Sequence, residues 1–188
     1  LDTGSAFEGM GASREAFFSA LAEPVIFICL LNVMRANKES SIVAALSAPM
    51  VTDSISVLLS ALPFFVVLLS ENARIPFDDP NTHLELTMIH EVMILDNSGP
   101  NLALIEYASS IKLWIFTLIL GRILLPIPHS HPVLQMLMLL IIMGLIAVII
   151  GIVESIMARV RLIKVPGLLF GAGVVALLGF LISITGVL

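Results

Sequence analysis

Long apolar runs separated by short polar segments dominate the sequence. Five of these runs approach or exceed the roughly 20 residues that an α-helix needs to cross a bilayer core of about 30 Å. They cover residues 15–34, 51–70, 102–124, 133–158 and 167–188. Strands of a membrane barrel would be about ten residues long and would alternate in polarity. The pattern therefore predicts an all-α, polytopic bundle of about five transmembrane helices, in a single membrane domain of residues 1–188.

The connection at residues 71–101 differs from the other connections. It is the longest of them, it is rich in acids, and it is too polar to cross a membrane. Long polar connections between packed elements often carry function. We therefore expect the functional residues to gather in this loop and next to it.

The composition agrees with a membrane protein. The sequence contains 188 residues, of which 59% are apolar and 12% charged, and its mean hydropathy is +1.09. A soluble domain carries about 25% charged residues, so soluble enzymes and disordered tails are excluded. The net charge of −5 also argues against a nucleic-acid partner, which requires clustered Lys and Arg. The single cysteine, Cys29, excludes a disulfide framework or a thiolate metal cluster on this chain.

The charges are unevenly distributed between the two sides of the predicted bundle. Five cations share the side of the long loop and three lie on the other side. This bias places the long loop in the cytoplasm, with the protein in the cell membrane. Eleven of the fourteen acids lie on or near the same side: Asp2, Glu8, Glu15, Glu71, Asp78, Asp79, Glu85, Glu91, Asp96, Glu106 and Glu154.

Glu23 is predicted to lie about two turns into the first span and is followed by Pro24. A charge at that depth costs several kcal/mol unless it is protonated, paired or hydrated. Glu15 precedes it by eight residues, about 80° around the helix, so both can face one cavity. Two interpretations of Glu23 stay open here, a protonatable stepping stone and an acid that pairs structurally with another helix.

Lys112 lies deep in the third span and needs a partner. Glu106 is six residues away, about 240° around the helix, so the two do not face each other. We therefore expect Lys112 to meet a carboxylate from another helix or from a neighbouring subunit. Glu154, near the end of the fourth span, is expected to form an interfacial salt bridge with Arg159.

The loop begins with the compact turn ENARIPFDDP, in which Pro76 and Pro80 restrict the backbone. Asp78 or Asp79 is expected to cap a helix at about residues 81–94. That helix would carry a polar stripe formed by His83, Thr87 and His90, with Glu91 beside it. Zinc-binding helices place two histidines four residues apart around a glutamate. The different spacing here favours a solvated or partner-contacting face over a metal site.

Three segments of the loop resemble a known family. ENARIPFDD (71–79), THLEL (82–86) and DNSG (96–99) are similar to the signature of the membrane subunit that anchors the peripheral arm of respiratory complex I. This is the NADH-quinone oxidoreductase subunit 1 family. GASRE (11–15) and the pair Glu106-Tyr107 resemble two further elements of that family. Its members have eight spans, so the resemblance implies that about three N-terminal spans precede this sequence.

The stretch TMIHEVMILDN, after Leu86, makes the loop longer than in the complex I pattern. With this stretch the sequence is most similar to the corresponding subunit of membrane-bound, energy-converting nickel-iron hydrogenases, of the formate hydrogenlyase and hydrogenase-4 type. In that branch the loop contacts hydrogenase-like large and small subunits and no quinone is required. The difference puts a quinone pocket in question.

The resemblance implies a coupling function. Electrons would pass between iron–sulfur clusters and a nickel-iron centre on partner subunits, with no catalytic residue, metal or cofactor on this chain. The loop would relay the redox event through Glu15, Glu23, Glu71, Asp78, Asp79, Glu85, Glu91, Asp96, Glu106 and Lys112. Docking of the peripheral arm would use Arg74, Pro76, Phe77, His83 and His90. Antiporter-like membrane subunits would then move protons or sodium ions.

Other functions stay open at this stage. The protein could be the quinone-site subunit of a complex I-type NADH dehydrogenase, or part of the membrane arm of a related sulfur reductase. A stand-alone ion transporter is disfavoured because no internal repeat or pair of broken helices is visible. In a passive anchor, the buried acids would be structural pairs only.

Overall fold

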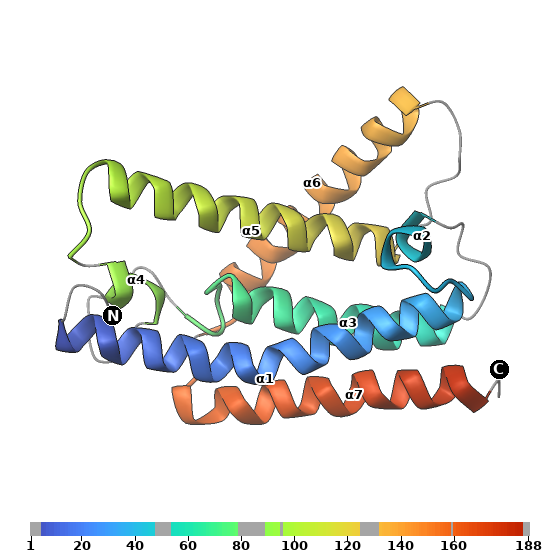
Figure 1. Ribbon diagram of the computed structural model, residues 1–188, viewed down its shortest axis with the longest axis horizontal. Coiled ribbons are helices and arrows are strands. Elements are labelled where there is room, and N and C mark those ends of the chain that lie inside the picture. Colours follow the sequence, from blue (N-terminus) through green and yellow to red (C-terminus); the bar gives the residue numbers. More distant parts are fainter. Residues whose placement is uncertain are drawn as a thin grey trace.

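A computed structural model describes residues 5–47, 54–78, 89–94, 96–124, 132–158 and 160–185. All the regular elements in these ranges are helical (Figure 1). The elements are α1 (Ala6–Ala36), α2 (Ile42–Ser47), α3 (Ser54–Glu71), α4 (His90–Ile94), α5 (Pro100–Leu124), α6 (Pro132–Ile156), the 3-10 turn η1 (Leu162–Lys164) and α7 (Val165–Thr185). The predicted all-α class is confirmed.

Helices α1, α3 and α7 lie side by side and pack against one another (Figure 1). Helix α5 packs on α3 and on the short α2, and α6 crosses α5 obliquely. The short α4 lies against α1, near the N-terminal end of the chain. The loop after α3 therefore returns to the first turns of α1, and this return places the loop residues beside the ends of the long helices.

Small and polar residues allow the close approach of α1, α3 and α7. A Cβ atom on Gly179 of α7 would lie 2.9 Å from Leu59 Cβ and 3.2 Å from Asn32 Nδ2. The buried amide of Asn32 on α1 also donates a hydrogen bond to the hydroxyl of Ser60 on α3. Small residues at crossings and hydrogen bonds between helices are typical of membrane bundles, because burial against lipid gives little driving force for association.

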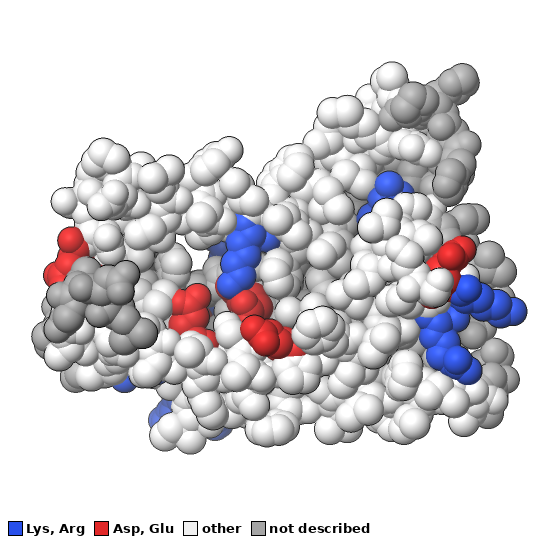
Figure 2. Space-filling model, viewed as in Figure 1, with Lys and Arg blue, Asp and Glu red and all other residues white. Residues whose placement is uncertain are grey.

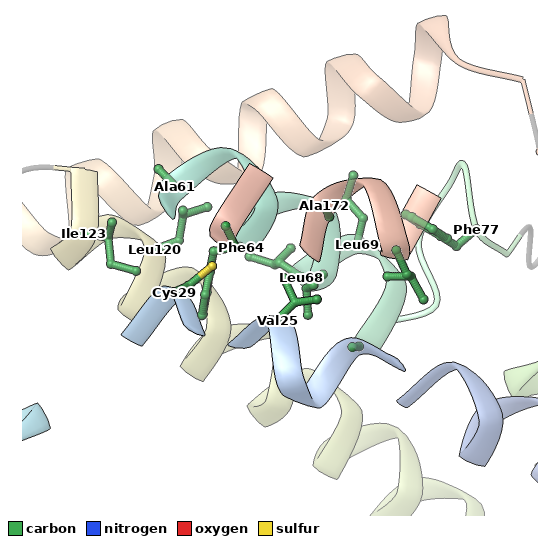
Figure 3. Packing of buried hydrophobic residues seen from close by; sticks show 14 of the residues in the cluster. Val25, Cys29, Ala61, Phe64, Leu68, Leu69, Phe77, Leu120, Ile123 and Ala172 are labelled. Carbon is green, nitrogen blue, oxygen red and sulfur yellow. The ribbon is translucent and has the colours of Figure 1, made fainter. Parts of the chain in front are cut away.

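The apolar core runs along the same three helices and continues to α5 (Figure 3). Phe64 and Leu68 on α3 are fully buried, and Leu120 and Ile123 in the C-terminal half of α5 belong to the same buried cluster. Cys29 of α1 lies in this core. Since the N-terminal half of α5 contributes little to the core, it is free to line a cavity.

Among the described residues, four helical stretches are long and apolar enough to cross a membrane: Glu8–Ala36, Pro100–Leu124, Val133–Ile156 and Leu162–Thr185. They correspond to the first, third, fourth and fifth predicted spans. The second predicted span, residues 51–70, corresponds to α3, whose apolar part Leu58–Glu71 is shorter. The protein is therefore a polytopic helical membrane protein, and the count of five spans stays a prediction.

Candidate functional site

A cavity of about 640 Å³ lies where the end of α3, the loop after it and the N-terminal half of α5 meet. Much of its lining is ionisable, and we call it the acidic cavity. The ionisable lining residues are Glu15, Glu71, Arg74, Asp78, His90, Glu106, Lys112 and Glu154. Figure 2 shows acidic and basic side chains meeting in the hollow between α5 and the layer below it, and a second group of charged side chains at the right-hand end of the same face.

The end of α3 directs charged side chains into this cavity. Ala73 adopts a left-handed conformation with φ 48°, and the N–H of Arg74 donates to the carbonyl of Leu69 at 2.9 Å. This arrangement is a common way to end a helix, because it satisfies a carbonyl that has no partner within the helix. The chain reverses there, and Glu71 and Arg74 line the cavity on either side of the turn.

Lys112 and Glu71 form an ion pair across the acidic cavity. Lys112 Nζ on α5 lies 2.7 Å from Glu71 Oε2 on α3. The carboxylate side chain is 9% exposed, whereas the lysine side chain is 36% exposed. The expectation that Lys112 meets a carboxylate from another helix is confirmed. Glu106 also lines the cavity, despite its rotation from Lys112, because the cavity extends along α5 over residues 105–113.

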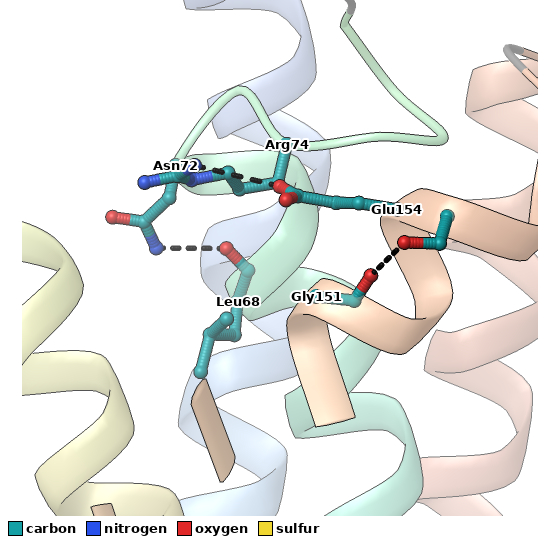
Figure 4. A network of polar contacts seen from close by, with 6 residues as sticks. Leu68, Asn72, Arg74, Gly151 and Glu154 are labelled. Atoms are coloured by element: carbon teal, nitrogen blue, oxygen red, sulfur yellow. Dashed lines mark hydrogen bonds and ion pairs between the residues drawn. The ribbon is translucent and has the colours of Figure 1, made fainter. Parts of the chain in front are cut away.

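A second ion pair connects the loop to α6. Arg74 Nη1 lies 3.4 Å from Glu154 Oε1 (Figure 4). The backbone strengthens this junction, because the N–H of Val160 donates to the carbonyl of Pro76 at 2.9 Å. The partner expected for Glu154 was Arg159, which lies outside the described residues. The described partner is instead far away in sequence, since the reversal after α3 brings Arg74 beside the end of α6.

Asp78 acts as a helix cap, as one of the two alternatives expected. Its Oδ2 accepts hydrogen bonds from the backbone N–H groups of Ile89 at 3.0 Å and of His90 at 3.1 Å. The side chain is 2% exposed. The capped helix, α4, is described from His90 onward, so the expected start near residue 81 lies outside the described residues. A relay role for Asp78 stays a prediction.

Two expected docking residues are buried within the chain itself. Phe77 is 2% exposed and belongs to the hydrophobic core, and Pro76 is also buried. The loop folds inward here and shields this apolar pair from solvent, so their side chains contact the chain's own core; a docking role for this turn stays a prediction. Of the other expected docking residues, Arg74 and the half-buried His90 line the acidic cavity.

Glu23 does not join the acidic cavity. Its side chain is exposed on α1 and is not among the cavity-lining residues, whereas Glu15 is. The expectation that both acids face one cavity is therefore wrong. The eight residues between them correspond to about 12 Å along the helix axis, so Glu23 lies beyond the part of α1 that borders the cavity.

The structure also gives Glu8 a role that sequence reasoning missed. This side chain is 3% exposed, and its Oε1 accepts a hydrogen bond from the backbone N–H of Asp96 at 3.0 Å. The side chain of Asp96 is itself exposed and outside the lining of the cavity. An acid in the first turn of a helix is too common a feature to indicate such a contact from sequence.

Several expected residues cannot be placed. Asp79, His83 and Glu85 lie outside the described residues, and for Glu91 only the backbone in α4 is described. Among the side chains that are described, no group of three or more His, Cys, Asp or Glu residues is arranged to hold a metal ion.

The fold and the site together define a class: a multi-pass helical membrane protein with a carboxylate-rich cavity beside an acidic loop. Over residues 1–185 the chain matches the NADH dehydrogenase family. It therefore belongs to this family, which is of the complex I subunit 1 type. The resemblance recognised in the loop motif is confirmed.

Two relatives from Escherichia coli (strain K12) agree with the hydrogenase branch. Hydrogenase-4 component C is 26% identical over 194 residues, which cover 99% of this chain and 61% of the relative. Formate hydrogenlyase subunit 4 is 25% identical over 189 residues, which cover 96% of this chain and 61% of the relative. The chain thus spans about three fifths of each relative's length. No solved structure matches the chain.

Proposed function

We propose that this protein is the membrane subunit of a complex I-like, energy-converting hydrogenase-type complex. In this function it docks a peripheral redox arm and couples electron transfer to the translocation of protons or sodium ions. The family and the two hydrogenase relatives support the type of complex. The iron–sulfur clusters and the nickel-iron centre belong to partner subunits of the arm, and antiporter-like membrane subunits carry the ions.

The acidic cavity is the observation that carries the coupling function. It gathers five carboxylic side chains with one lysine, one arginine and one histidine next to the loop that would face the arm. Carboxylates in one confined space compete for ionisation, so they take up and release protons as a group. A change of charge at the loop can therefore redistribute protons among them.

The Glu71–Lys112 pair is the part of the cavity best suited to respond to a change of charge at the loop. Protonation of Glu71 removes the charge that holds the lysine ammonium at 2.7 Å. Lys112 then becomes available to the other carboxylates that line the same cavity, such as Glu106. One proton transfer thus changes the electrostatic environment on both α3 and α5, which is the kind of local event that a coupling subunit needs.

The test replaces both members of the pair in the assembled complex. Removing one partner would leave an uncompensated charge and could prevent folding, so the informative variant is the double replacement Glu71→Gln with Lys112→Gln. We expect normal assembly and hydrogen formation, but about tenfold or greater loss of ion translocation per electron in inverted membrane vesicles. The matched control is Glu39→Gln, an exposed acid far from the cavity. Unchanged translocation in the double variant would contradict the proposal.

A second candidate, the quinone-site subunit of a complex I-type enzyme, is favoured by one observation. An apolar groove of about 390 Å³ between α5 and α6 ends at Arg74 and Glu154, which also line the acidic cavity. Such a groove fits an apolar tail whose polar head reaches the cavity. Electron transfer that depends on an added short-chain quinone would favour this function over the hydrogenase type.

A further inference from the structure

Helix α4 is attached to the rest of the molecule at three points, two near its start and one just after its end. Asp78 binds the backbone N–H groups of Ile89 and His90. On the other side, a Cβ atom on Gly11 would lie 2.9 Å from the carbonyl oxygen of Ile89 and 3.0 Å from Met93 Cγ. Glu8, about one turn before Gly11 on α1, accepts a hydrogen bond from the backbone N–H of Asp96, just after α4. His90 therefore has a defined position relative to α1.

This attachment brings His90 together with two carboxylates. Glu15 lies four residues after Gly11, on the same face of α1, and it shares the lining of the acidic cavity with Glu71 and His90. The same three residues also line a small adjoining pocket. The rest of its lining consists of Ser19 and Ser70 and of the apolar residues Phe18, Ala73, Phe77 and Ile89.

The small pocket has a volume of about 20 Å³. A polar cavity of this size has room for a single water molecule, provided that two to four polar groups surround it. Five of the lining residues have side chains that can supply such groups: Glu15, Ser19, Ser70, Glu71 and His90. A water molecule there would connect His90 to Glu15 and Glu71 by hydrogen bonds.

Histidine is the side chain type best suited to exchange protons near neutral pH, and its two ring nitrogens can accept a proton on one side and release it on the other. We propose that His90 exchanges protons with Glu15 and Glu71 through a water molecule in the small pocket, and that Gly11 and Asp78 are its positioning residues. This proposal rests on the proposed function, because it gives the carboxylates of the acidic cavity a proton donor and acceptor.

The proton balance is simple. Protonated His90 gives its proton to the water, which passes one to a carboxylate, and the neutral imidazole then takes up the next proton. The charged groups that surround this exchange are Glu15 on α1, Glu71 on α3, Arg74 and Asp78 in the loop, Glu106 and Lys112 on α5, and Glu154 on α6. The pH profile of translocation therefore reflects His90 together with these neighbours.

The experiment uses the assembled complex in inverted membrane vesicles, with a low-potential artificial electron donor. Proton translocation per hydrogen formed is measured from mildly acidic to mildly alkaline pH. We expect His90→Gln to lower translocation by about tenfold or more and to change the pH profile. We also expect added imidazole to restore translocation in His90→Ala, which a purely structural role would not predict.

Glycine variants test the positioning. Gly11→Ala forces α4 away from α1, whereas a Cβ atom on Gly9 would meet nothing within 4 Å. We expect Gly11→Ala to lower translocation and Gly9→Ala to leave it unchanged. If neither His90 variant assembles, the two glycine variants provide the test. Equal pH profiles for these two variants would then overturn the proposal.

The outcomes separate this proposal from the proposed function. If His90→Gln retains translocation while the Glu71 and Lys112 double variant loses it, His90 is not the exchanging group and the coupling function stands. If both retain translocation, the coupling function itself fails. A loss in His90→Ala that imidazole does not restore, with an unchanged pH profile, would assign His90 a structural role and overturn the proposal.

Discussion

The acids on and near α1 differ in what surrounds them. Glu8 is buried and binds a backbone N–H, and Glu15 lines the acidic cavity. Glu23 is exposed, in the middle of an apolar helix that is long enough to cross the membrane. A carboxylate that faced lipid at this depth would cost several kcal/mol. We therefore expect a hydrogen-bonding partner for Glu23 from outside the described residues.

This expectation predicts different effects for two substitutions. Glu23→Gln keeps a hydrogen-bonding group and should leave the amount of assembled complex on native gels unchanged. Glu23→Leu removes that group and should reduce assembly several-fold, whereas a lipid-facing position would tolerate leucine well. The control is Glu39→Leu, which makes the same change at an exposed site beyond the end of α1. Equal assembly of all three variants would contradict the expectation, and a relay role for Glu23 stays a prediction.

Among the elements, α7 depends on a close crossing with α3 and α1. Gly179 is buried at this crossing, whereas Gly171 on the same helix is exposed and has open space around it. The two glycines have the same backbone environment and differ in their neighbours. They therefore separate the effect of helix propensity from that of packing.

Gly179→Ala should lower the free energy of unfolding by about 1–3 kcal/mol, since the new methyl group would overlap Leu59. Gly171→Ala should have no such cost. Cys29 is the single cysteine and is fully buried, so a thiol-reactive dye reports unfolding in detergent during a temperature scan. Equal melting temperatures for the two variants would show that the crossing is looser than the structure indicates.

At the scale of the whole molecule, two groups of charged residues lie toward different ends of the described helices. The acidic cavity lies toward the end where α1 begins, whereas Lys38 and Glu39 follow the other end of α1. The excess of cations on the loop side predicts that this side faces the cytoplasm. Because both ends carry exposed residues, the orientation can be measured directly.

Asp96→Cys and Lys38→Cys, each in a Cys29→Ala background, place single thiols at exposed positions on opposite ends. A membrane-impermeant maleimide should label Asp96→Cys in inverted vesicles and Lys38→Cys in intact spheroplasts. The reverse pattern would place the acidic loop outside the cytoplasm. Labelling of both variants in the same preparation would contradict the predicted span between them.

The sequence by itself determined that the protein lies in a membrane, that it is helical and which family it belongs to. Apolar runs of spanning length have only a few stable structures in lipid, because every backbone polar group must be satisfied within the chain. The loop motif indicated the family, and the depth of Lys112 implied a carboxylate partner on another helix. These conclusions depend on the local pattern of residues and on the cost of an unpaired charge, and both can be inferred from the amino-acid sequence alone.

Only the tertiary structure decided which ionisable groups meet. Glu71 pairs with Lys112 and Arg74 with Glu154 across large separations in sequence, while Glu23 is exposed and does not line the cavity that Glu15 lines. Helix rotation limits which faces two residues can share, but it does not say which face a neighbouring helix will cover. That choice depends on packing at sites such as Gly11 and Gly179, where the absence of a side chain sets how closely two elements approach.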